Sequence, residues 1–226
     1  MNTPHFRSLV AAACMVGAAC CAPVASANTI VEFNTSLGSF DLSLDDAVAP
    51  STVANFLSYV QAGSYADTVV HRSVPGFVIQ GGGFHTDFSS VATSAPIAYE
   101  QGLSNVRGTI AMARTADLNS ATSQWFINTA DNPSLDTGKY AAFGYVIGDG
   151  MKVVDAIAAL GIYNLSNFAG GAFGEVPLHD VGNATTFSPS FFVTVDVKVV
   201  PEPQTWMLMG LGLTALALTA RRARPS

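Results

Sequence analysis

The chain has 226 residues, of which 49% are hydrophobic and 12% are charged, which is enough for one well-buried domain with further segments at its ends. Residues 28–200 carry six Lys and Arg against fifteen Asp and Glu, a formal net charge of −9. Nucleic acid is therefore not expected as a partner, because a phosphate backbone requires a basic surface.

The first 27 residues have the three parts of a secretory signal. Arg7 lies in a short polar start, residues 9–24 form an apolar run, and residues 25–27 read Ala-Ser-Ala, the small residues that a signal peptidase recognises. We therefore expect residues 1–27 to be a signal peptide and the mature chain to begin at Asn28. A buried N-terminal helix is the alternative.

All the cysteines lie inside this signal, at Cys14, Cys20 and Cys21. Disulfides, thiol catalysis and cysteine-ligated metals are thereby excluded from the mature protein. Lipid attachment at Cys20 is a minor alternative, because the large aliphatic residue usual three positions earlier is missing.

The mature chain opens with a hairpin and a helix. Residues 30–44 alternate apolar and polar side chains on both sides of a Ser-Leu-Gly-Ser turn, which predicts a β-hairpin. A helix should begin near Pro50, which the first turn tolerates, and end at Gly63. Its apolar residues recur with helical spacing at Val53, Phe56, Leu57 and Val60.

A single arginine, Arg72, follows between two short apolar runs. The runs at 69–72 and 77–80 are predicted strands, and the Pro-Gly pair at 75–76 forces a turn between them. This turn is expected to bring Gln80 back beside Arg72.

The rest of the chain is rich in short strands. Residues 85–105 are polar and predict a long surface excursion, and 161–190 predict an insertion loop. The regular elements expected are strands at 109–113, 124–128, 142–147 and 191–200 and a second helix at 150–160. About eight short strands with two helices predict a mainly β fold, a closed antiparallel barrel with helices covering its open ends.

Several kinds of site find no support in the sequence. It contains no HExxH motif, no phosphate loop and no G-x-S-x-G elbow, and the histidines of the mature chain, His71, His85 and His179, lack metal-ligand spacing. No cofactor and no metal are therefore expected. His71 is interpreted as a packed histidine rather than a general base.

Four blocks resemble the cyclophilin-type peptidyl-prolyl cis-trans isomerases of the bacterial, exported kind. They are HRSVPGFVIQGGGF (71–84), GTIAMAR (108–114), SATSQWFIN (120–128) and LDTGKYAAFGYVIGDGMKVVDAI (135–157), and they occur in the order of the family. The resemblance implies a domain over residues 28–200 that folds as an eight-stranded barrel capped by two helices.

The resemblance also implies the roles of individual residues. Arg72 would be the catalytic donor to the prolyl nitrogen, and Gln80 would orient it and touch the substrate backbone. The substrate-binding residues implied are Phe77, Val78, Met112, Ala113, Arg114, Gln124, Phe126, Leu135 and Tyr140. The chain departs from common family residues at five positions: Val78 for Met, Arg114 for Asn, Trp125 for Phe, Ser134 for the Trp of cyclosporin-sensitive members, and Tyr140 for His.

The C-terminus carries a second resemblance. Pro-Glu-Pro at 201–203 precedes an apolar run at 206–220 and a basic end at 221–224, which resembles the PEP-CTERM sorting signals that an exosortase is thought to process. We therefore expect residues 201–226 to form a sorting segment with a transmembrane helix that holds the protein in the inner membrane before processing. An ordinary tail anchor is the alternative.

Taken together, these patterns predict a monomeric isomerase of X-Pro bonds that acts on proline-containing polypeptides. Its place would be the periplasm, the cell envelope or the extracellular matrix. Two alternatives stay open: a non-catalytic proline-binding or chaperone module, and a surface-matrix component for which the barrel is only a scaffold.

Overall fold

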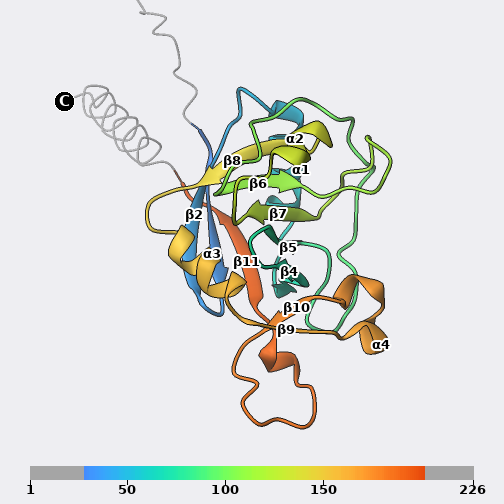
Figure 1. Ribbon diagram of the computed structural model, residues 1–226. Coiled ribbons are helices and arrows are strands. Elements are labelled where there is room, and N and C mark those ends of the chain that lie inside the picture. The colour runs from blue at the N-terminus through green and yellow to red at the C-terminus, as the bar shows by residue number, and fades with distance from the viewer. Residues whose placement is uncertain (1–27, 202–226) are drawn as a thin grey trace, which may run out of the picture.

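A computed structural model describes residues 28–201 (Figure 1). Its main feature is a curled antiparallel sheet with the strand order β3-β11-β1-β2-β8-β6-β7-β5-β4. The strands are β1 (Ile30–Thr35), β2 (Gly38–Leu44), β3 (Thr68–Val69), β4 (Arg72–Val74), β5 (Val78–Gly81), β6 (Thr109–Met112), β7 (Trp125–Asn128), β8 (Ala142–Val146) and β11 (Thr194–Val199).

The sheet is not the closed eight-stranded barrel that was predicted. Its two edges, β3 and β4, are consecutive pieces of one segment that was expected to form a single strand. The segment changes partners in its middle: Val70 donates its N–H to the carbonyl of Val193 at 3.0 Å, and His71 donates to the carbonyl of Gln80 at 3.1 Å. The mainly β, antiparallel character is confirmed, but no ladder joins β3 to β4, so the sheet is curled rather than a closed barrel.

Both predicted helices are present, as α1 (Pro50–Gln61) and α3 (Met151–Ala158). α1 has Pro50 in its first turn and is followed by Gly63 with φ of +68°, as its sequence indicates. Two short helices were not predicted, α2 (Pro133–Thr137) and α4 (Ser166–Ala169), because five and four residues are too few to show helical periodicity.

The main hydrophobic core lies between the sheet and the two longer helices. The ring of Phe33 on β1 stacks on Phe56 of α1 at 6.1 Å and meets the edge of Trp125 on β7 at 5.0 Å. The glycines after Gln80 make room for this indole, since a Cβ on Gly81 or Gly82 would lie 2.7 or 2.6 Å from the Trp125 ring. Trp125 thus explains the first two glycines of the run at the end of β5, whereas a Cβ on the third, Gly83, would lie 2.8 Å from the Gln124 side chain.

The segment expected to be an insertion loop has structure of its own. It contains β9 (Gly161–Tyr163), paired with β10 (Val176–Leu178), as well as α4 and a 3₁₀ turn at 171–173; a second 3₁₀ turn at 189–191 precedes β11. A separate small core forms beneath it, made of Val69, Leu165, Phe173, Val176, Leu178 and Phe192. In Figure 1 the β9–β10 pair lies next to β4, so this segment reaches the strand that carries Arg72.

The excursion at 85–105 has only isolated backbone pairs, such as Ile97 with Ala121, as predicted. Within residues 28–201 no helix has both the length and the apolar character needed to cross a membrane. The signal peptide predicted at 1–27 and the apolar run predicted at 206–220 lie outside the described residues.

Candidate active site

The turn between β4 and β5 brings Arg72 opposite Gln80, as predicted. Their Cα atoms are register partners, and Arg72 Nη1 lies 3.5 Å from Gln80 Oε1. Gly76 takes a φ of +69° in this turn, and Phe77 N–H donates to the carbonyl of Val74 at 3.0 Å. A positive φ suits glycine, so the Pro-Gly pair fixes the register that places the two side chains together.

A chain of polar contacts continues on both sides of this pair. Gln80 Nε2 donates to Gln124 Oε1 at 2.9 Å, which leaves its own Oε1 directed at Arg72. On the other side, Arg72 Nε donates to Glu175 Oε2 at 2.9 Å. Sequence reasoning missed Glu175, because it lies 103 positions away in a segment with no periodic pattern.

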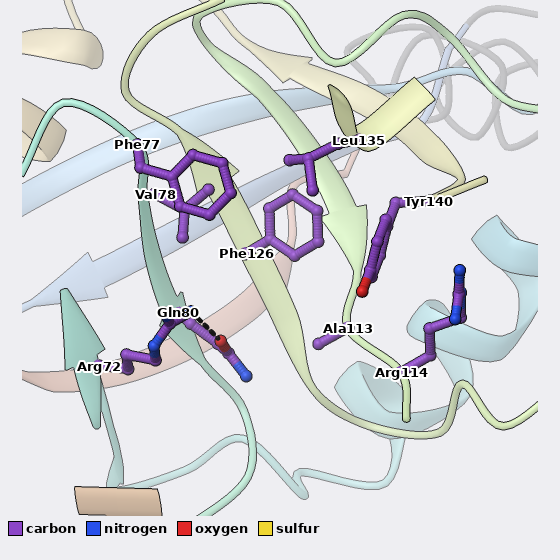
Figure 2. A pocket seen from close by; sticks show the side chains of 9 residues that line it. All are labelled: Arg72, Phe77, Val78, Gln80, Ala113, Arg114, Phe126, Leu135 and Tyr140. Carbon is purple, nitrogen blue, oxygen red and sulfur yellow. Dashed lines mark hydrogen bonds between the residues drawn. The ribbon is translucent and has the colours of Figure 1, made fainter. Parts of the chain in front are cut away.

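Beside Arg72 is a cavity of about 220 Å³. Figure 2 shows the ring of Phe126 between Phe77 and Val78 on one side and Leu135 and Tyr140 on the other, with Arg72 and Gln80 together at one end. The cavity is lined by Arg72, Phe77, Val78, Gln80, Ala113, Arg114, Phe126, Leu135 and Tyr140. These come from four separate stretches of the chain, and all nine were singled out from the sequence.

Two predicted residues lie outside the cavity lining. Met112 pairs with Trp125 across β6 and β7 and is buried in the main core, because successive strand residues point to opposite faces of the sheet. Its neighbour Ala111 instead lies opposite Phe126, on the cavity side. Gln124 does not line the cavity, and its side chain is linked to the site by the hydrogen bond that its Oε1 accepts from Gln80 Nε2.

Arg114 forms part of the far wall. Its guanidinium carbon lies 4.4 Å from the centre of the Tyr140 ring, Nη1 donates to the carbonyl of Thr115 at 2.8 Å, and Nη2 donates to the carbonyl of Gly138. The Tyr140 ring in turn meets the edge of Phe126 at 5.8 Å. These contacts hold a cation at the groove while its Nη1 and Nη2 each donate to the protein's own backbone.

His71 is unsuited to act as a base in this cavity. Its ring is buried beside Phe84, at 5.0 Å between centroids, and its Nδ1 has no hydrogen-bond partner. Burial, and next the adjacent Arg72 guanidinium, lower the pKa of His71 from 6.5 to about 4, although a backbone contact with Val69 opposes this shift. His71 is therefore neutral at physiological pH and packs rather than reacts.

A Ser-His-Asp alignment elsewhere in the structure cannot supply a nucleophile. His179 Nδ1 lies 2.8 Å from Asp180 Oδ2, and its Nε2 lies 3.2 Å from Ser36 Oγ. The same Nε2 lies 3.0 Å from the carbonyl of Phe192, which can only accept, so Nε2 carries a proton and cannot take one from Ser36. Over residues 28–201, no group of three His, Cys, Asp or Glu side chains is placed to hold a metal.

Comparison with known proteins gives a family for most of the chain. The family model described as "Cyclophilin type peptidyl-prolyl cis-trans isomerase/CLD" matches residues 30–177, and that of the "PEP-CTERM protein-sorting motif" matches residues 199–223. "Peptidyl-prolyl cis-trans isomerase A" of Dickeya dadantii is 46% identical over 159 residues, covering 68% of this chain and 80% of the relative.

Two further relatives and a solved structure bear the same kind of enzyme name. "Peptidyl-prolyl cis-trans isomerase" of Acinetobacter baylyi is 51% identical over 140 residues, 59% of this chain and 74% of the relative. "Peptidyl-prolyl cis-trans isomerase B" of Escherichia coli is 42% identical over 161 residues, 67% of this chain and 94% of the relative. A crystal structure of a cyclophilin type peptidyl-prolyl cis-trans isomerase from Cryptosporidium parvum superposes with a TM-score of 0.58 at 22% identity, over 78% of this chain and 99% of that one.

Proposed function

The chain belongs to the family of cyclophilin-type peptidyl-prolyl cis-trans isomerases, and we propose that its Arg72 cavity accelerates rotation about X-Pro bonds in exported polypeptides. Unassisted, this rotation takes tens to hundreds of seconds, because it must break amide resonance across a barrier of roughly 18–20 kcal/mol. No nucleophile, proton transfer or cofactor is required for it.

The chemistry follows from the change at the prolyl nitrogen. In the twisted transition state this nitrogen becomes pyramidal and regains a lone pair, which the planar amide does not offer. A guanidinium beside it gains a hydrogen bond only as the bond twists, which is catalysis by preferential binding of the transition state. Arg72 suits the task because it stays charged and holds its donors in a fixed fork.

The observation that carries the proposal is the position of Arg72 at one end of an apolar slot. Phe126, only 5% exposed, forms the floor of this slot with Phe77 and Leu135 nearby (Figure 2). A proline ring could rest on Phe126 while its nitrogen faced the guanidinium. Gln80, held by Gln124 on one side and directed at Arg72 on the other, is proposed to orient the cation and to contact the substrate backbone.

A peptide isomerisation assay on the mature chain tests this proposal. Arg72→Ala should lower kcat/KM for an Ala-Pro peptide by about 10²–10³-fold, as expected when one transition-state donor is removed, while far-UV circular dichroism stays unchanged. Asp149→Ala is a suitable control, because that carboxylate is 84% exposed and lies outside the cavity. Equal rates for wild type and Arg72→Ala would refute the mechanism. Tight peptide binding with negligible turnover in wild type would instead favour a holding module.

We further propose that the chain consists of a signal peptide at 1–27, the isomerase domain at 28–200 and a sorting segment at 201–226. The matched sorting motif supports the last of these and points to export to the cell envelope and to an exosortase-type enzyme as a partner. A membrane helix within this segment would anchor the protein before processing. Deletion of residues 201–226 should change the location of the protein and leave its isomerase activity intact, which cell fractionation with the same assay would measure.

A further inference from the structure

The segment between α3 and β11 folds back onto the strand that carries Arg72. Ser73 N–H, on β4, donates to the carbonyl of Glu175 at 2.7 Å. On either side of Glu175, Phe173 and Val176 are fully buried in the small second core, and the ring of Phe173 lies 6.1 Å from that of His71. The backbone of Glu175 is therefore fixed directly beside Arg72.

From this position the side chain of Glu175 meets the inner part of the guanidinium. Its Oε2 accepts from Arg72 Nε at 2.9 Å, while Nη1 on the other edge lies 3.5 Å from Gln80 Oε1. Two contacts on different nitrogens fix the plane of the guanidinium, because its five donors form a rigid fork. The remaining Nη donors are then left for the cavity that Arg72 lines.

A contribution to folding stability is a poor explanation for this ion pair. The side chains of Arg72 and Glu175 are 37% and 48% exposed, and pairs this exposed add little to stability because water screens them. The orientation of the guanidinium matters far more for the reaction rate, since small misplacements of a catalytic group cost large factors in rate.

We propose that Glu175 is a positioning residue, supplied by the segment between α3 and β11, that holds the Arg72 guanidinium in its catalytic orientation. This inference rests on the proposed isomerase function of Arg72. It assigns to this segment a role that its sequence does not show, because the segment carries one carboxylate to the back of Arg72.

The test compares Glu175→Ala and Glu175→Gln in the mature chain, with kcat and KM measured for an Ala-Pro peptide. Glu175→Ala should lower kcat about fivefold, equivalent to about 1 kcal/mol, with KM little changed, since Gln80 still holds the other edge. Glu175→Gln should keep most of the activity, because its amide oxygen can still accept from Nε. Asp149→Ala, which makes the same change in net charge as Glu175→Ala, should behave as wild type.

A spectroscopic measurement separates orientation from a general structural effect. The Nε–Hε signal of Arg72 in a ¹⁵N correlation spectrum, identified by its loss in Arg72→Ala, should be visible in wild type and in Glu175→Gln. In Glu175→Ala it should broaden through exchange with water, while the backbone spectrum stays otherwise the same.

The outcomes distinguish this inference from the function on which it rests. If Arg72→Ala is as active as wild type, the proposed function itself fails. If Arg72→Ala is inactive but Glu175→Ala retains wild-type kcat or exceeds it, the positioning role is wrong and the function stands. A Glu175→Gln variant as impaired as Glu175→Ala would also overturn the proposal, since it would show that charge rather than orientation is what the carboxylate provides.

Discussion

The buried His71 should make the protein lose stability in mild acid. In the unfolded chain its pKa is near 6.5, whereas burial and the neighbouring Arg72 lower the pKa of His71 to about 4 in the folded protein. Between these two values the unfolded chain binds a proton that the folded protein does not. The stabilisation from a neutral His71 is therefore complete above pH 6.5 and is lost progressively as the pH falls to about 4.

The size of the effect follows from the shift in pKa. Each pKa unit corresponds to about 1.4 kcal/mol, so His71 alone should lower the free energy of unfolding by about 3 kcal/mol across this range. His71→Phe removes the titration and keeps an aromatic ring against Phe84 and Phe173, the rings that face His71. Its stability near pH 7.5 can differ from that of wild type in either direction without affecting the comparison.

Urea unfolding followed by tryptophan fluorescence, at several pH values between 7.5 and 4, measures the difference. Carboxylates elsewhere titrate in both proteins and cancel, so the wild-type curve should fall about 3 kcal/mol further than the His71→Phe curve. Parallel curves would refute the reasoning. The rate should behave differently from stability, because Arg72 stays charged. The kcat/KM of the folded enzyme should be flat from about pH 6 to 8. A step in kcat/KM within this range, seen in wild type but not in His71→Phe, would indicate that His71 takes part in the reaction.

Three further predictions concern the fold and the slot. Gly102→Ala should lower the free energy of unfolding by about 2–3 kcal/mol in urea titrations, since the new Cβ would collide with the carbonyl of Ala142; Gly171→Ala, with open space around it, should cost under about 0.5 kcal/mol. Phe126→Ala should reduce kcat/KM about tenfold, mainly through KM, because the proline ring loses its apolar floor. With Ser134 in place of a tryptophan, cyclosporin should bind weakly in an inhibition assay, and a sub-micromolar inhibition constant would contradict this.

Much of the fold could be predicted because its signals are local. The hairpin of β1 and β2 and the helix α1 are encoded by alternation, by helical spacing and by turn residues within a few positions of one another. The approach of Arg72 to Gln80 has the same origin, since a Pro-Gly turn between two short strands fixes their register. Phe126 and Leu135 could be assigned to the slot only through the resemblance of whole blocks, because no local pattern separates a slot residue from a core residue.

Other features depend on where distant segments meet. The two edges of the curled sheet lie where the segment after Thr68 changes partners at Val70 and His71, and a pattern of apolar residues does not encode that exchange. Met112 has an apolar side chain, as the other residues of the slot wall do, but the alternation of side chains along β6 turns it toward Trp125.

Glu175 is the clearest example of a feature that depends on where distant segments meet. The sequence by itself determined the cation, its glutamine partner and the apolar residues of the slot. Only the tertiary structure decided which carboxylate stands behind that cation, because the contact joins residues 103 positions apart, and no spacing along the chain records it.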